Sequence, residues 1–120
     1  MKNIEEKTKE INWNTKDNKQ LIEAVLVLRN ADEAKRFLRD LMTKGEIQEF
    51  ANRLETARLL SKDVQYCAII ESTGLSSTTI ARISKWLNGS LGGYRLVIAR
   101  LAKNISLHHH IPIKLAKGSS

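Results

Sequence analysis

Apolar residues recur every three or four positions along most of this 120-residue chain, which places them on one face of successive helices. The pattern predicts no strand and favours an all-α fold. The helices that it predicts cover about residues 17–29, 31–43, 44–61, 65–72, 77–87 and 94–103. We expect the folded domain to span residues 17–103, between a flexible arm over 1–16 and a flexible basic tail over 104–120.

Residues with capping side chains stand where several of these helices should begin. Asp17 is a candidate N-cap for the first helix, and Asn30 or Asp32 for the second. Thr43-x-x-Glu46 matches a capping box, in which the threonine oxygen accepts from the third helical amide and the glutamate reaches back. These positions support the predicted helix starts.

The first predicted helix is apolar around most of its circumference, with the run LIEAVLVL over residues 21–28. Such a helix must be buried on more than one face. A chain this short can hardly surround the helix alone, whereas a second subunit could do so. We therefore expect a homodimer. The alternative is a monomeric bundle with this helix at its centre.

Residues 64–86, VQYCAIIESTGLSSTTIARISKW, predict two short helices joined by a tight turn at Gly74. Glycine takes the left-handed conformation of a helix end without steric cost. Leu75 should fill the inside of the turn, and Ser76 or Ser77 should cap the second helix. Apolar residues expected to point into the core are Ile69 and Ile70 on the first helix and Ile80, Ile83 and Leu87 on the second. Ile70 stands where close-packed motifs of this kind carry alanine, so we expect a slightly wider helix crossing.

The opposite face of the second helix carries Ser77, Thr78, Ala81, Arg82 and Lys85. Short hydroxyl side chains allow close approach to DNA, a threonine methyl can touch a thymine methyl, and the cations can reach guanine edges or phosphates. Helix-turn-helix proteins place the start of this second helix in the major groove. The alternative is an ordinary helical hairpin with a glycine turn.

Charge is segregated along the chain. Residues 1–71 hold 13 acidic and 13 basic side chains, whereas residues 72–120 hold seven basic side chains and no acidic ones, so the whole net charge of +7 lies after Glu71. Such segregation makes a surface that attracts polyanions. The basic residues of this half are Arg82, Lys85, Arg95, Arg100, Lys103, Lys114 and Lys117.

Several other classes of protein fit the sequence poorly. The single cysteine, Cys67, leaves no intramolecular disulfide, and no apolar run is long enough to span a membrane, which agrees with a cytoplasmic protein. His108–His110 lie in the tail with no cysteine or acidic residue nearby, so we expect no metal site. No catalytic constellation is present, and we expect neither an enzyme nor a cofactor.

From about Asp17 to Lys103 the chain resembles the Trp repressor superfamily, most closely its YerC/YecD-like branch. The runs that carry the resemblance are FLRDLMTKGEIQEFANRLETARLL, IIESTG, SSTTIARISKWLN and GGYRLVIARL. The resemblance implies a six-helix fold that dimerises by intertwining, in agreement with the over-apolar first helix. It also implies a bacterial transcription regulator that binds double-stranded DNA.

The tryptophan-sensing members of this superfamily hold the amino acid between two arginines. Arg53 and Arg82 match those positions, and Thr43 matches a threonine that lines the same pocket. Ile83 stands where the repressor has a glycine beside the ligand, and Trp86 where it has a serine. These side chains could fill the pocket, which argues against L-tryptophan as an effector.

Asp40, in addition, replaces an apolar residue of the pocket wall. Of the repressor's DNA-facing residues, Thr79 and Ser84 match here, whereas Cys67 falls where the repressor has an arginine. The base preference of the repressor therefore does not transfer to this chain.

The sequence thus predicts a homodimeric, sequence-specific DNA-binding regulator, with repression as the expected role. One alternative is a repressor that depends on a small carboxylate effector bound by Thr43, Arg53 and Arg82. Another is an adaptor whose basic face docks an acidic protein. The expected DNA-binding residues are Ser76, Ser77, Thr78, Thr79, Arg82, Ser84 and Lys85.

Overall fold

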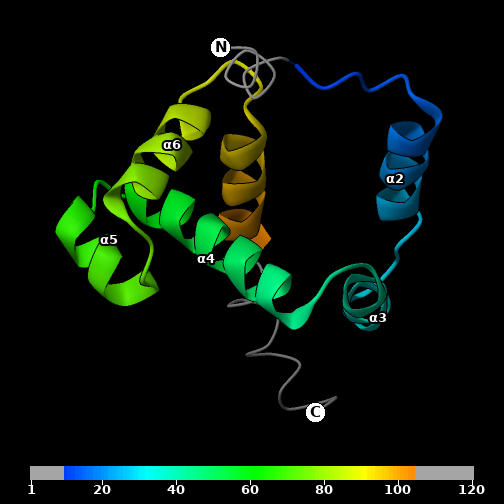
Figure 1. The fold of residues 1–120 in the computed structure, drawn as a ribbon, viewed down its shortest axis with the longest axis horizontal. Coiled ribbons are helices and arrows are strands. Elements are labelled where there is room, and N and C mark those ends of the chain that lie inside the picture. The colour runs from blue at the N-terminus through cyan, green and yellow to red at the C-terminus, as the bar shows by residue number, and fades with distance from the viewer. Residues whose placement is uncertain (1–9, 105–120) are drawn as a thin grey trace. The chain divides into compact units, whose positions relative to one another are not determined.

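The structure is a computed structural model that describes residues 10–104 (Figure 1). This part of the chain contains six helices and no strand, which confirms the all-α class. The helices are α2 (Lys16–Leu26), α3 (Ala31–Leu41), α4 (Lys44–Ser61), α5 (Tyr66–Thr73), α6 (Ser77–Leu87) and a last helix over residues 93–104. His108–His110 and most of the predicted arm and tail lie outside the described residues.

The chain divides into two compact units, Met1–Thr43 and Lys44–Ser120. The first unit contains α2 and α3, and neither helix has a buried residue. Apolar side chains of α2 are exposed instead, among them Ile22 at 42% and Leu26 at 75%. The apolar character that predicted burial for α2 is therefore present, but this chain alone does not cover it.

The start of α2 corrects one prediction. Thr15, rather than Asp17, is the N-cap, because its hydroxyl oxygen accepts a hydrogen bond from the Asn18 amide at 3.2 Å. Asp17 lies inside the first turn, where its charge favours the helix dipole. The helix also ends earlier than predicted, at Leu26 instead of Arg29.

The start of α3 confirms Asn30 as its cap. The Asn30 side chain accepts from the Glu33 amide at 2.9 Å, and the Glu33 carboxylate accepts from the Arg29 amide at 2.9 Å. This reciprocal pair satisfies two amides at the helix start. α4 then begins directly after Thr43 and ends at Ser61, as predicted.

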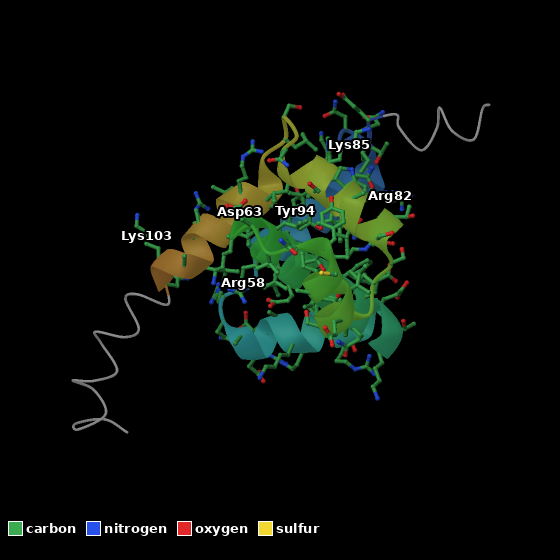
Figure 2. The ribbon with its side chains drawn as sticks, turned by 90° about the vertical axis from the view of Figure 1, so that its left-hand side faces the viewer. Arg58, Asp63, Arg82, Lys85, Tyr94 and Lys103 are labelled. Atoms are coloured by element: carbon green, nitrogen blue, oxygen red, sulfur yellow. The ribbon has the colours of Figure 1, made fainter. Side chains whose placement is uncertain are left out.

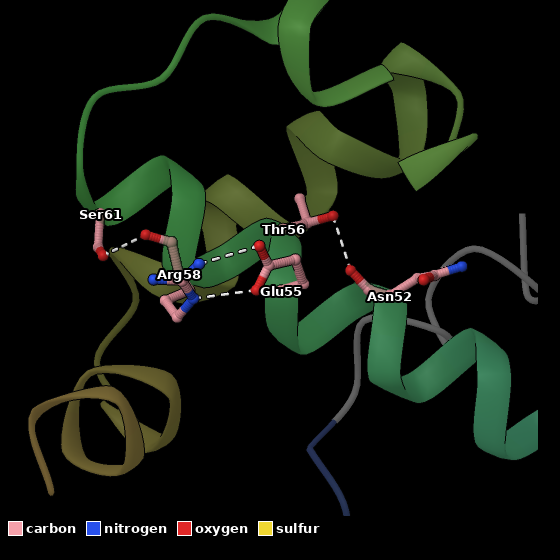
Figure 3. Close-up of polar contacts among 5 residues, drawn as sticks. All are labelled: Asn52, Glu55, Thr56, Arg58 and Ser61. Atoms are coloured by element: carbon pink, nitrogen blue, oxygen red, sulfur yellow. Dashed lines mark hydrogen bonds and ion pairs between the residues drawn. The ribbon is translucent and has the colours of Figure 1, made fainter. Parts of the chain in front are cut away.

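The core of the second unit lies where α4, α5 and α6 contact one another. Its fully buried apolar side chains are Ala57, Ile69, Ile80 and Ile83. Thr56 is also fully buried, and its hydroxyl donates to the Asn52 carbonyl at 2.8 Å, which satisfies the polar group (Figure 3).

The apolar spacing of α4 includes Phe50, but 46% of its surface is exposed, so this side chain lies largely outside the core. Its ring lies 5.8 Å from the Arg53 guanidinium, one turn along α4. The aromatic face thus packs against a cation on its own helix rather than against the core.

Glu55 and Arg58 form a bidentate ion pair on α4, with N–O distances of 2.9 and 3.0 Å (Figure 3). The hydrogen bonds from Arg58 lower the pKa of Glu55 below its ordinary value of 4.5. A lowered pKa in the folded state adds stability above the unfolded pKa, and that stability is lost as the pH falls through the folded pKa.

We expect Glu55→Gln to lower the free energy of unfolding at pH 7 by only about 0.5 kcal/mol, since both side chains are more than a third exposed. The difference from the wild type should vanish once the pH is well below the folded pKa of Glu55. Urea unfolding at pH 7 and at acidic pH measures both values. A difference that is equal at both pH values would contradict an electrostatic origin.

Candidate nucleic-acid interface

The turn between α5 and α6 is held by glycine and by a hydroxyl group. Gly74 ends α5 in the left-handed conformation, with φ of 78°, and its amide donates to the Ile70 carbonyl at 2.8 Å. The Thr73 hydroxyl donates to the Ile69 carbonyl at 2.7 Å and accepts from the Leu75 amide at 3.2 Å. The predicted role of Gly74 is confirmed. The two hydrogen bonds of the Thr73 hydroxyl also stabilise the turn, which the sequence did not reveal.

A second residue takes the left-handed conformation, in the turn between α4 and α5. Asp63 has φ of 63°, so a residue with a Cβ already adopts the strained left-handed conformation there. At Gly74 an alanine would meet no atom within 4 Å, and only its left-handed backbone would be strained. We therefore expect opposite signs for two substitutions. Asp63→Gly should stabilise the fold by up to about 1 kcal/mol, and Gly74→Ala should destabilise it by about 1 kcal/mol. Thermal unfolding of both variants measures the pair, and equal signs would contradict the backbone argument.

The inward face of α5 is narrower than predicted. Ile69 is fully buried, but Ile70 is 38% exposed, so the prediction that both point inward was wrong. Neighbouring residues on a helix differ by about 100° in direction, and the side of α5 that carries Ile69 is the one that packs. The wider helix crossing expected from Ile70 stays a prediction.

α6 has a clear division between its two faces. Ile80, Ile83 and Leu87 are buried, as predicted, and they fix one side of the helix against α4 and α5. The opposite side is exposed along its length, at Ser77, Thr78, Ala81, Arg82 and Lys85. Figure 2 labels Arg82 and Lys85 on this helix.

The predicted DNA-binding hydroxyls fall into two groups. The Ser76 hydroxyl caps α6 by accepting from the Thr79 amide at 3.1 Å, and it also donates to the Thr79 hydroxyl at 3.1 Å. Ser77 and Thr78, by contrast, are exposed, and within residues 10–104 their side chains make no hydrogen bond. Ser84 is half-buried. Ser77 and Thr78 are therefore the hydroxyls best placed for an external contact.

The basic residues after Glu71 also differ in whether their side chains have a partner within the chain. The ion pairs within residues 10–104 all lie between Asp32 and Arg58. Arg82, Lys85, Arg100 and Lys103 have no ion pair within that range, whereas Arg95 donates to a backbone carbonyl. Their charge is therefore not neutralised by acidic side chains of the described chain.

Arg53, one of the residues matched to an effector pocket, is largely engaged within the chain. Its Nη2 lies 2.7 Å from the Glu49 carboxylate, and 29% of its side chain is exposed. Its buried Nε has no hydrogen-bond partner among the described residues. Burial raises the pKa of Tyr94, and the positive charge of Arg53 opposes this shift.

The other residues matched to the pocket are placed differently. Arg82 is exposed on α6, and Thr43 belongs to the other compact unit. Ile83, expected to help fill the pocket, is fully buried in the core, whereas Trp86 is 46% exposed. Ile83 thus belongs to the core-facing side of α6, and about half of the Trp86 side chain is accessible to solvent.

Residues 10–104 offer neither a metal site nor a membrane-spanning helix. No group of three or more His, Cys, Asp or Glu side chains within residues 10–104 could hold a metal ion. Within the same range, no helix combines the length and apolar character needed to cross a membrane.

α5, the Gly74 turn and α6 together define a helix-turn-helix protein, with a buried inner face and, on α6, an exposed outer face without acidic residues. The chain belongs to the Trp repressor protein family, whose pattern it matches over residues 16–102. It is 38% identical to the uncharacterised protein YerC of Bacillus subtilis over 86 residues, which cover 72% of this chain and 83% of YerC.

Two solved structures are similar to this chain. A TrpR-like protein from Eubacterium eligens has a TM-score of 0.71 and 38% identity, with 75% of this chain and 93% of that chain covered. A candidate Trp repressor from Staphylococcus aureus has a TM-score of 0.71 and 27% identity, with 78% and 96% covered. These likenesses confirm the resemblance seen in the sequence and the Trp-repressor-like fold.

Proposed function

We propose that this protein is a sequence-specific DNA-binding transcription regulator, acting as a repressor and as a homodimer. The observation that carries the proposal is the outer face of α6. Within residues 10–104, it presents two hydroxyls that make no hydrogen bond and two cations that form no ion pair, on a helix whose other face packs into the core. Membership of the Trp repressor family supports the same conclusion.

The chemistry of this face suits the major groove. Ser77 and Thr78 lie in the first turn of α6, where free backbone amides and the helix dipole also favour a phosphate. Arg82, one turn further on, has the length and planar shape to donate two hydrogen bonds to a guanine. Lys85 follows on the same face and suits a phosphate contact.

The homodimer is supported by the exposed first unit. α2 and α3 have 11 residues each, a length at which isolated helices are marginal in water. Both lack buried residues, so their stability requires a partner surface. The exposed apolar side chains of α2 are suited to a second copy of this chain. Two copies would present two α6 helices, and we expect an operator with two half-sites about 34 Å apart.

Selection of genomic DNA fragments by the purified protein tests the proposal. The selection is repeated at several salt concentrations, with and without L-tryptophan. We expect enrichment of a roughly palindromic sequence that is independent of L-tryptophan. Binding that depends only on salt, with no enriched sequence, would rule out operator recognition and would favour a merely basic surface.

A second candidate function is effector-dependent binding, and the buried, unsatisfied Nε of Arg53 is the observation that favours it. Glu49 already neutralises much of this guanidinium, which works against a second carboxylate. Thermal unfolding in the presence of amino acids distinguishes the two functions. A ligand at 100 times its Kd should stabilise the protein by about 2.7 kcal/mol, and Arg53→Gln should abolish that gain.

Arg82→Ala should weaken specific DNA binding by about 1–3 kcal/mol if the guanidinium reads a base. The loss should concentrate at one position of the operator, because the other base pairs keep their contacts. Lys62→Ala, in the turn before α5, removes the same charge elsewhere and serves as the control. Equal losses of DNA affinity in both variants would mean that Arg82 contributes only its positive charge and reads no base.

A further inference from the structure

The C-terminal end of α6 is tied to the last helix by Arg95. The Nη1 atom of Arg95 donates a hydrogen bond of 2.5 Å to the carbonyl of Leu87, the last residue of α6. A helix leaves its last carbonyls without partners, and a cation there also complements the helix dipole. Arg95 therefore closes the end of the proposed reading helix from the helix that follows it along the chain.

Two other end carbonyls of α6 are satisfied locally. The Ser84 carbonyl accepts from the Asn88 amide at 3.1 Å and from its side-chain amide at 2.9 Å, and the Trp86 carbonyl accepts from the Gly89 amide at 3.1 Å. These bonds join residues within one turn. Within the described chain, the Arg95 bond alone connects an end carbonyl of α6 to the last helix.

Gly92 makes room for this bond. Its φ is +71°, and its carbonyl accepts from the Leu96 amide at 3.0 Å at the start of the last helix. A Cβ added at Gly92 would lie 3.1 Å from Nη2 of Arg95, whereas one added at Gly93 would meet nothing within 4 Å. A side chain at Gly92 would thus press on the guanidinium that binds Leu87, and a side chain at Gly93 would not.

We infer that Arg95 and Gly92 are positioning residues that fix the direction of α6 relative to the last helix, and through it the base preference of the protein. The inference rests on the proposed DNA-binding function. Arg95 belongs to the acid-free basic half, yet its guanidinium is directed at a helix end. Its loss should therefore act on specificity, and not through a lost phosphate contact.

The test compares four proteins: the wild type, Arg95→Gln, Gly92→Ala and Gly93→Ala. Gly92→Ala disturbs the bond without changing charge, but at φ +71° it also strains the backbone, a strain that Arg95→Gln does not introduce. Gly93→Ala is the neighbouring control for an added methyl group. Affinities for the selected operator and for unrelated DNA are measured over a range of salt. Hydrogen exchange of the amides of residues 87–89 is measured without DNA.

We expect Arg95→Gln and Gly92→Ala to lower the ratio of operator affinity to unrelated-DNA affinity about tenfold, with the salt dependence unchanged. The exchange of the amides of residues 87–89 should become about tenfold faster in both, and Gly93→Ala should match the wild type in every measurement. Gly92→Ala keeps Arg95, so it also covers the case in which Arg95→Gln fails to fold.

A fall of about 1 in the salt slope of Arg95→Gln, with Gly92→Ala unaffected, would make Arg95 a phosphate contact and overturn the inference. Unchanged affinity ratios in both variants would also overturn it. If the wild type has no operator preference, the proposed function fails. Hydrogen exchange then still decides whether Arg95 and Gly92 hold the end of α6.

Discussion

Ile22→Asp should convert the proposed homodimer into monomers and abolish operator binding. Ile22 lies within the exposed apolar stripe of α2, beside Leu21, Val25 and Leu26. A carboxylate buried there without a partner would cost about 2 kcal/mol or more, and a two-fold symmetric dimer would bury two of them. The dimer Kd should therefore rise on the order of a thousandfold.

Sedimentation over a range of protein concentration measures this change, and gel shift with the selected operator measures its effect on DNA binding. Gln20→Asp is the matched control, since it adds the same charge to the same helix at an exposed polar position. We expect Gln20→Asp to remain dimeric. An Ile22→Asp protein that also stays dimeric would show that the partner surface of α2 is not another copy of this chain.

The sequence predicted the helices well wherever a local signal marks their ends. Asn30 and Gly74 lie where capping rules place them, and α4 begins and ends as the periodicity predicts. The error at α2 arose between two capping residues that stand two positions apart, Thr15 and Asp17. Either can cap a helix, and only the backbone decides which hydrogen bond forms.

Burial was predicted less well, because it depends on contacts between helices. Ile69 and Ile70 are identical neighbours, and only the packing of α5 decides that the first is buried and the second exposed. Thr56 is buried although its type favours exposure, because its hydroxyl bonds within α4. The apolar periodicity of α4 gave no signal for it.

The sequence predicted which residues lie on the outer face of α6, but not which of their side chains are without hydrogen-bond partners. Helical spacing alone placed Ser77, Thr78, Arg82 and Lys85 on the outer side of α6. Three-dimensional contacts decide the hydrogen bonds, such as the one between Ser76 and Thr79. The same holds for the bond from Arg95 to Leu87. From the sequence, Arg95 was only one more cation of the basic half, whereas the structure gives it a carbonyl partner.

Ile69→Ala should lower the free energy of unfolding by about 2–5 kcal/mol, because it removes a fully buried side chain and leaves a cavity among α4, α5 and α6. Ile70→Ala makes the same chemical change one residue further along α5, where the side chain is 38% exposed. Its loss should stay below about 1.5 kcal/mol, since solvent already covers part of the methyl groups removed.

Urea unfolding of the two variants at equal protein concentration measures the difference, since the stability of a dimer depends on concentration. Both alanine variants have the same helix propensity, so the difference reports burial alone. A stability loss of that size is a large part of the total for a domain of this length. Ile69→Ala should therefore also weaken operator binding near its unfolding temperature, while Ile70→Ala should not. Equal losses would mean that a partner subunit buries Ile70 as deeply as this chain buries Ile69.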